Sequence, residues 1–234
     1  NDDKWINAIL KGYASLGHPA INGVLITHGH NDHVGGLKRI LSAIDAPVFC
    51  HPKLVGRLEK LLGSNVVHPI FDNQTVEITE SVNLLSIFTP GHDETHVCYY
   101  MNEEEVMFTG DTVLGSSSST VQNMSDYMDS MCRLSAHKVS TICPAHGAVC
   151  LPPDGEQLIA KYIENRLNRE RAIIGAIGRG VNTVESIVQE IYSPQLNKGL
   201  RAAASRNIVA HLEKLVKENV VRKNPINFGY VLVS

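Results

Sequence analysis

The residues most suited to chemistry form one short run, Thr27-His28-Gly29-His30-Asn31-Asp32-His33. Three imidazoles and one carboxylate fall within six residues, directly after residues 21–26, an apolar segment with the character of a strand. Gly29, Asn31 and the pair Gly35-Gly36 favour a tight turn that opens a helix. A divalent transition metal prefers this set of donors, and an apolar core does not accept it cheaply, so the run predicts a metal site rather than a polar surface turn.

Three later motifs each end a predicted strand with a turn-forming residue and then present one more ligand-type side chain. They are Thr89-Pro90-Gly91-His92, Phe108-Thr109-Gly110-Asp111 and Cys143-Pro144-Ala145-His146-Gly147. Ligands at strand ends lie on a rigid edge and leave one side open to substrate. Together the four motifs supply five histidines and two aspartates, a set that argues against a coincidence of structural polar residues.

In this order and spacing the motifs resemble those of the metallo-β-lactamase superfamily, over residues 1 to about 150. The resemblance implies an α/β fold, the αββα sandwich of that superfamily. It also implies two metal sites, with His28, His30 and His92 in the first, Asp32, His33 and His146 in the second, and Asp111 bridging both. Two zinc ions suit these donors best, with manganese or iron as alternatives.

Two metal ions roughly 3.5–4 Å apart hold a bridging water and lower its pKa towards neutrality. The hydroxide attacks a carbonyl carbon or a phosphorus atom while the ions stabilise the charge that develops on oxygen. Asp32 is placed to orient the hydroxide, so we predict a catalytic role for it besides metal binding.

His96 follows His92 by four residues and leads into the next predicted strand. One interpretation makes it catalytic, in contact with substrate or as a proton donor to the leaving group; the other makes it a structural support for the ligands. The serine run 116–119 after Asp111 predicts a flexible loop, with a place on the rim of the site as the alternative. The remaining histidines match no motif.

The order of predicted elements favours two sheets packed face to face and flanked by helices. A helix is predicted over residues 3–14, with Trp5, Ile6, Ile9, Leu10 and Tyr13 on one face. Strands and helices alternate up to residue 63. From about residue 65 short strands between turns predict an antiparallel sheet, followed by a helix over 122–136 and a strand over 139–143.

The composition changes after residue 153, and the C-terminal third predicts a winged helix. A long amphipathic helix over 156–177 precedes a second helix, which Asn182 is expected to cap with Glu185 completing a capping box. A helix over 199–218 and a hairpin follow. We therefore divide the chain into a catalytic domain (1–150), a connecting helix (151–178) and a winged-helix-like domain (179–234).

Charge is divided unevenly along the chain. Residues 1–150 carry a net charge of −7 and residues 151–234 carry +4, which together give the overall −3. A basic C-terminal third permits contact with nucleic acid, and a packing lid or dimer surface is the alternative use of a winged helix. No apolar run approaches the roughly 20 residues that span a bilayer, so we expect no membrane partner. The five cysteines have no CxxC spacing and are expected to be reduced, mostly buried thiols.

Segments 165–171, 181–188 and 207–215, together with Gly110–Gly115, resemble the beta-lactamase-like protein 2 family of the glyoxalase II-like branch. This resemblance implies a metal-dependent endoribonuclease that acts on single-stranded RNA, located in the mitochondrial matrix or in the cytoplasm. The family begins with further strands and an Asp-Thr-Gly-like turn, and the sequence does not begin with Met, so we expect an N-terminally truncated chain.

Three functions remain open from the sequence. The first is the endoribonuclease, favoured by the two-metal site and the basic C-terminal third. The second is a thioester hydrolase of the glyoxalase II kind, because the same hydroxide attacks an acyl carbon and the catalytic body is acidic. The third is a non-enzymatic nucleic-acid-binding module, which the complete ligand set argues against.

Overall fold

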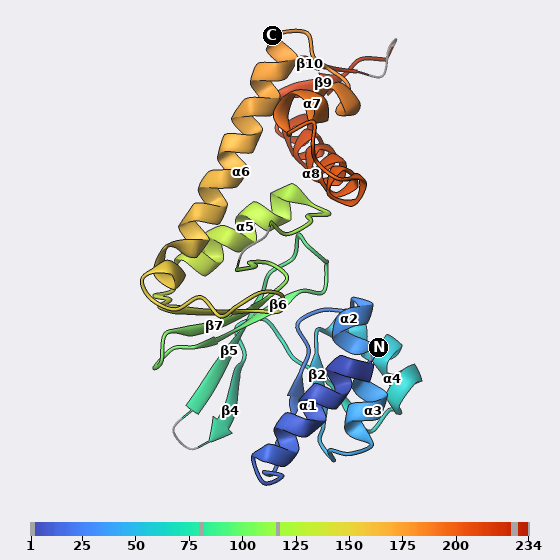
Figure 1. Ribbon diagram of the computed structural model, residues 1–234, viewed down its shortest axis with the longest axis vertical. Coiled ribbons are helices and arrows are strands. Elements are labelled where there is room, and N and C mark those ends of the chain that lie inside the picture. Colours follow the sequence, from blue (N-terminus) through green and yellow to red (C-terminus); the bar gives the residue numbers. More distant parts are fainter. Residues whose placement is uncertain (1–2, 80–81, 116–117, 226–228, 234) are drawn as a thin grey trace.

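The computed structural model describes residues 3–79, 82–115, 118–225 and 229–233. Helices and two sheets form the lower body in Figure 1, and the long helix α6 connects it to a C-terminal helical unit. Among the described helices, none has the length and apolar composition needed to cross a bilayer.

The first sheet consists of three short parallel strands in the order β1-β2-β3. Its strands are β1 (Val24–Leu25), β2 (Val48–Cys50) and β3 (Val67–Pro69), and the helices beside it are α1 (Asp3–Ser15), α2 (Asn31–Val34), α3 (Leu37–Leu41) and α4 (Pro52–Leu62). Aliphatic side chains of α2, α3 and α4, Leu58 among them, pack against Val48 and Cys50 of the sheet. The prediction that the antiparallel sheet begins near residue 65 was wrong for β3, because the crossover through α4 returns the chain parallel to β2.

Helix α1 formed as predicted, but its predicted apolar face is only partly buried. Ile6 is 3% exposed and contacts the turn at Gly36, whereas Trp5 is 64% exposed and Ile9 is 52% exposed. Helical periodicity therefore predicted the helix correctly and overestimated the contact that it makes with the rest of the described chain.

The second sheet has five strands in the order β4-β5-β6-β7-β8. They are β4 (Thr75–Thr79), β5 (Val82–Phe88), β6 (Val97–Met101), β7 (Val106–Gly110) and β8 (Thr141–Pro144). Strands β4 to β7 are antiparallel, as the sequence predicted. Strand β8 is parallel to β7, because helix α5 (Met124–Ser135) forms the crossover between them.

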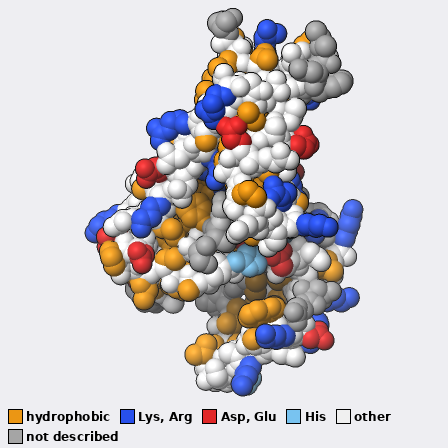
Figure 2. All heavy atoms as spheres, turned by 45° about the horizontal axis from the view of Figure 1, so that its top comes forward, with side chains coloured by type: hydrophobic (Ala, Val, Ile, Leu, Met, Phe, Trp, Pro, Cys, Tyr) orange, Lys and Arg blue, Asp and Glu red, His pale blue; other side chains and the backbone are white. Residues whose placement is uncertain are grey.

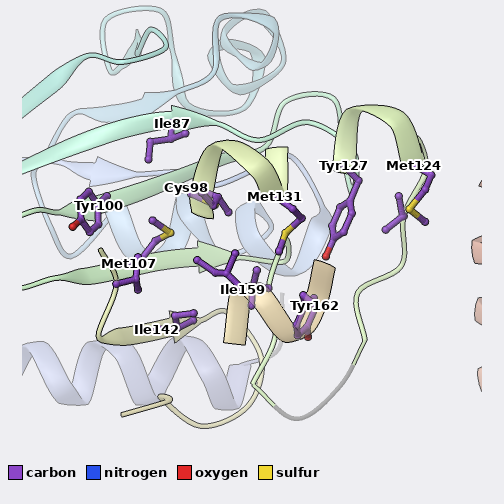
Figure 3. Close-up of a cluster of buried hydrophobic side chains, with 14 of the residues drawn as sticks. Ile87, Cys98, Tyr100, Met107, Met124, Tyr127, Met131, Ile142, Ile159 and Tyr162 are labelled. Atoms are coloured by element: carbon purple, nitrogen blue, oxygen red, sulfur yellow. The ribbon is translucent and has the colours of Figure 1, made fainter. Parts of the chain in front are cut away.

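Side chains on β6 alternate between the two faces of this sheet, as extended backbone requires. Val97 and Tyr99 belong to a cluster that includes Leu25 and Phe49 of the first sheet, so the sheets pack face to face. Cys98 and Tyr100 point the other way, into the cluster with α5 and α6 that Figure 3 shows. Helices, two sheets and helices thus form the predicted αββα sandwich.

The C-terminal third begins with α6 (Asp154–Gly178), which corresponds to the long helix predicted over 156–177. Its other elements are α7 (Val184–Ile191), α8 (Lys198–Lys217), β9 (Val221–Lys223) and β10 (Tyr230–Leu232). Helix α8 matches the helix predicted over 199–218, and its Ala204, Ile208, Leu212 and Leu215 are buried against α6 and α7. The antiparallel β9–β10 pair forms the predicted hairpin.

The cap predicted for α7 was displaced by one residue. Thr183, not Asn182, is the N-cap, and Ser186 rather than Glu185 completes the capping box. The hydroxyl of Thr183 accepts a hydrogen bond from the backbone N–H of Ser186, three residues further on. An N-cap side chain bonds to the N–H two or three residues later, so Asn182 is one position too early to cap Ser186. The thiols are free as expected, with Cys50 and Cys98 buried, but Cys132 is exposed.

Candidate metal centre

Four strand ends bring together all seven side chains that the sequence predicted as ligands. The motif residues lie after β1, β5, β7 and β8, and the first motif opens helix α2. The ligand-type atoms form two groups, in each of which they lie within 4.8 Å of one another: His28, His30, His92 and Asp111, and Asp32, His33 and His146. We name these the inner group and the outer group. In Figure 2 a histidine reaches the surface where the body meets the C-terminal helices.

Two of the glycines in these motifs are required by close contacts. Gly91 has a φ of +134°, and a Cβ there would lie 2.5 Å from the Tyr127 backbone of α5. Gly110 has a φ of +49°, and a Cβ there would lie 2.6 Å from Nε2 of His96. Each glycine lets the chain turn immediately before a ligand, so His92 and Asp111 enter the site from opposite strands.

The inner group aims three ring nitrogens at one point. Nδ1 of His30 lies 2.9 Å from Nε2 of His28 and 3.0 Å from Nε2 of His92. Nε2 of His92 is also 3.5 Å from Oδ2 of Asp111. Nitrogen lone pairs this close repel one another unless a proton or a cation lies between them, so the arrangement fits a metal ion.

The outer group meets the other oxygen of the same carboxylate. Oδ1 of Asp111 lies 3.5 Å from Nε2 of His33 and 3.4 Å from Nε2 of His146. Oδ2 of Asp32 lies 3.2 Å from the same atom of His146. Because Oδ2 of Asp111 faces the inner group and Oδ1 faces the outer group, the carboxylate has the geometry of a bridging ligand.

Two buried polar atoms of the site have no good hydrogen-bond partner, and this bears on whether the residues fit a metal ion. Nε2 of His33 and Oδ1 of Asp111 are buried and form no well-made hydrogen bond, and leaving such atoms unpaired is costly. They are also the two atoms that a cation in the outer group would contact. The residues present therefore fit divalent metal ions at both groups.

The protonation states of the donors agree with this fit. Burial, together with the neighbouring His33 and His92, lowers the pKa of His28 to about 3. Burial by itself raises the pKa of Asp111, but the adjacent His33, His146 and His92 outweigh it and hold the pKa at about 2. Both side chains thus keep the deprotonated form that metal binding needs.

His96 lies behind the ligands and has no exposed surface. Its Nε2 accepts a hydrogen bond from the backbone N–H of Asp111 at 3.0 Å, so its Nδ1 carries the proton and donates to Oγ1 of Thr89 at 2.8 Å. Burial holds the pKa of His96 well below its usual range. This geometry fits the interpretation of His96 as a support for the ligands, and the catalytic role stays a prediction.

Several contributors to the site were not identified from the sequence. Oδ2 of Asp93 lies 3.6 Å from Nε2 of His30, the ring nitrogen that does not face the other inner ligands. The carbonyl of Thr120 lies 2.6 Å from Nδ1 of His92, and Oγ of Ser119 is 3.3 Å from the same atom. Only Asp93 had a local signal, its place directly after a ligand. Ser119 belongs to the predicted serine loop, whose residues 116 and 117 lie outside the described residues.

A mixed sandwich with clustered histidines and aspartates at its strand ends is the arrangement of a metal-binding domain. Residues 4–146 match the family model described as the metallo-beta-lactamase superfamily. Residues 183–227 match the beta-lactamase associated winged helix domain. The chain therefore belongs to the metallo-beta-lactamase superfamily, as the sequence motifs indicated.

Several curated proteins are similar over most of the chain. An atrochrysone carboxyl ACP thioesterase of Cryptosporiopsis sp. is 31% identical over 91% of this chain and 66% of its own length. A beta-lactamase-like protein 2 homolog of Drosophila melanogaster is 32% identical over 87% of this chain and 71% of its own length. The chain spans about two thirds of the length of such relatives.

Solved structures confirm the fold. A beta-lactamase domain protein from Burkholderia ambifaria superposes with a TM-score of 0.81 at 15% identity, over 100% of this chain and 81% of the other. A metallo-beta-lactamase family protein from Thermus thermophilus gives a TM-score of 0.73 at 22% identity, over 97% of this chain and 85% of the other. At these identities the likeness concerns the fold alone.

Proposed function

We propose that the chain is a two-metal hydrolase that cleaves acyl thioesters. Membership of the superfamily and the double ligand group support metal-dependent hydrolysis. The observation that carries the choice of bond is the burial of His96, which removes the proton donor that the sequence offered.

The leaving group explains why that burial matters. An alcohol has a pKa near that of water, about 16, so an alkoxide departs poorly without a proton donor or a cation beside it. A thiol has a pKa of about 8.5, so a thiolate departs without prior protonation. Because both ring nitrogens of His96 are engaged by Asp111, Thr89 and Thr112, His96 supplies no proton to a leaving group, and a thioester is the bond whose leaving group needs none.

When bound, two divalent ions supply Lewis acidity and a water of lowered pKa where the ligand groups meet. The Asp32 carboxylate, with a side chain 58% exposed, would accept a hydrogen bond from a water held there and orient it towards the acyl carbon. Asp93 keeps the His30 ring in place, and Thr120 does the same for His92. Water adds its oxygen to the acyl carbon and the carbon–sulfur bond breaks. The departing thiolate takes up one proton of the water and the other passes to solvent, so the products are a carboxylate and a thiol.

The named relatives support the same choice. Proteins called atrochrysone carboxyl ACP thioesterases, from Cryptosporiopsis sp., Aspergillus novofumigatus and Aspergillus aculeatus, are 29–31% identical to this chain. An acyl group carried as a thioester is therefore the substrate class that we propose. For the metal we propose zinc, because imidazole and carboxylate donors of this number suit it.

The second candidate is the endoribonuclease that acts on single-stranded RNA. The basic C-terminal third supports it, with a net charge of +4. Figure 2 shows Lys and Arg side chains on this face, with Asp and Glu side chains among them, and Lys and Arg attract a phosphate backbone.

The test compares both bonds on one metal-loaded preparation. The chain, with bound metal quantified, is incubated with a panel of acyl-CoA thioesters and, in parallel, with labelled single-stranded RNA; His30→Ala serves as the matched control. We expect thioester hydrolysis that His30→Ala abolishes. RNA cleavage without thioester turnover would overturn the proposal in favour of the second candidate, and no turnover of either bond by a chain with two bound metals would overturn both.

A further inference from the structure

The metal ligand His92 is oriented by a loop rather than by a helix or strand. Its Nε2 faces the other inner ligands, so Nδ1 is the nitrogen that lies 2.6 Å from the Thr120 carbonyl. A carbonyl only accepts hydrogen bonds, so Nδ1 carries the proton and the lone pair remains on Nε2, the atom that binds metal. The position of one carbonyl oxygen thus sets both the ring orientation and the tautomer of His92.

The two peptide groups next to Thr120 are held by one side chain from the C-terminal third. Oδ1 of Asn207, on α8, accepts from the backbone N–H of Val121 at 2.9 Å. Nδ2 of Asn207 lies 3.4 Å from the carbonyl of Ser119, to which it donates. Because one partner only donates and the other only accepts, the orientation of the Asn207 amide is fixed.

A buried arginine holds the same loop from α6. Nη2 of Arg166 donates to the Ser119 carbonyl at 2.7 Å, and the Arg166 residue is 6% exposed. Its guanidinium also lies 5.1 Å from the centre of the Tyr127 ring, whose backbone packs against Gly91, the residue before His92. Glu170, one turn further along α6, lies against Lys214 and His211, and the Arg166 guanidinium is directed at the loop carbonyl and the ring.

We propose that Arg166 and Asn207 are positioning residues for the metal centre. They clamp Ser119–Val121 so that the Thr120 carbonyl holds His92 ready to bind metal in the inner group. The winged-helix-like region, through Asn207, therefore completes a site that the catalytic body supplies with ligands. The proposal concerns metal binding and is independent of which bond the centre cleaves.

The test measures metal affinity rather than turnover. Asn207→Leu and Arg166→Met are made in the full chain, and the dissociation constants of both zinc ions are measured by competition with a chromogenic chelator. Loss of a group that orients a ligating histidine costs roughly 10–100-fold in metal affinity, so we expect about tenfold weaker binding at the inner group and little change at the outer one. Arg169→Met is the matched control, because the Arg169 side chain stacks on Tyr192 instead.

A second measurement separates positioning from folding. Histidine-ring nitrogen NMR of the zinc-loaded chain reports the proton on Nδ1 of His92, and we expect its exchange with water to accelerate in Asn207→Leu. Unchanged affinity and unchanged exchange in both variants would overturn the proposal. Equal weakening of both metal groups, in step with a lower melting temperature, would also overturn it, since that pattern indicates a purely structural role.

Discussion

The inner and outer ligand groups differ in how firmly the protein holds them. In the inner group the side chains of His92 and Asp111 are 9% and 12% exposed, His28 is fully buried and only His30 is 37% exposed; His28 and His92 are supported from behind by Thr27 and Thr120. In the outer group only His33 is mostly buried, at 12%, whereas the side chains of Asp32 and His146 are 58% and 52% exposed. Preorganised, buried donors lose little freedom when they bind, so the inner group is expected to bind metal more tightly and release it more slowly than the outer group.

Asp111 is the point that the two groups share, and its replacement should have the largest effect. Asp111→Asn removes the charge that faces both groups, so we expect loss of both metals. A bound metal contributes several kcal/mol of transition-state stabilisation, and the expected fall in hydrolytic rate is therefore on the order of 10³-fold. Metal content by mass spectrometry and initial rates measure this, and retention of both metals would contradict the bridging assignment.

Removal of one ligand from each group tests the comparison directly. His28→Ala should abolish the tighter binding step, with a loss greater than the roughly 100-fold reached when only a supporting partner is removed. His146→Ala should weaken only the second step. Chelator competition measures both steps, and an equal effect of the two substitutions on both steps would show that the groups are not distinct.

Substitution of His96 should reduce metal affinity less than loss of a ligand does, and it tests whether His96 supports the ligands or donates a proton. His96→Phe leaves the buried N–H of Asp111 without an acceptor, and we expect a loss of roughly tenfold in metal affinity. His96→Gln offers an amide oxygen to that N–H and should recover part of the loss. If His96 is a support, the pH dependence of kcat in His96→Gln should have the same shape as in the wild type. Loss of the fall in kcat at high pH would identify His96 as a proton donor.

The smallest expected effect concerns a buried histidine that is not a predicted ligand, and it is an effect on folding stability rather than on metal binding. His211 of α8 is fully buried, and Nδ1 lies 3.5 Å from Glu170. Burial lowers its pKa, although Glu170 acts in the opposite direction. The unfolded chain therefore takes up a proton at this position as the pH falls below about 6.5 while the folded chain does not, so folding stability falls on acidification.

His211→Leu should reduce that dependence. The change in slope is at most about 1.4 kcal/mol per pH unit, the limit for uptake of one proton. Urea unfolding of the metal-free chain at pH 7 and pH 5, compared between wild type and variant, measures it. A steeper dependence in the variant would mean that Glu170 rather than burial controls this histidine.

The sequence by itself identified the candidate ligands, the sandwich and the winged helix. Each ligand motif is a local feature, a strand followed by a turn and a donor, and all seven predicted ligands occupy one site. Local periodicity likewise predicted α6, α8 and the β9–β10 hairpin. Such features depend on residues near one another in the chain, which is why the motifs and apolar patterns contain them.

Only the tertiary structure decided how those ligands are held. The two oxygens of Asp111 face different groups because four strand ends converge there, and His96 is buried because Asp111 and Thr89 close over it from separate strands. Arg166 is 47 residues away in sequence from the carbonyl that it holds, and Asn207 is 86 residues from the N–H that it accepts. No local pattern specifies contacts across such distances, because they arise from the packing of the C-terminal helices on the body.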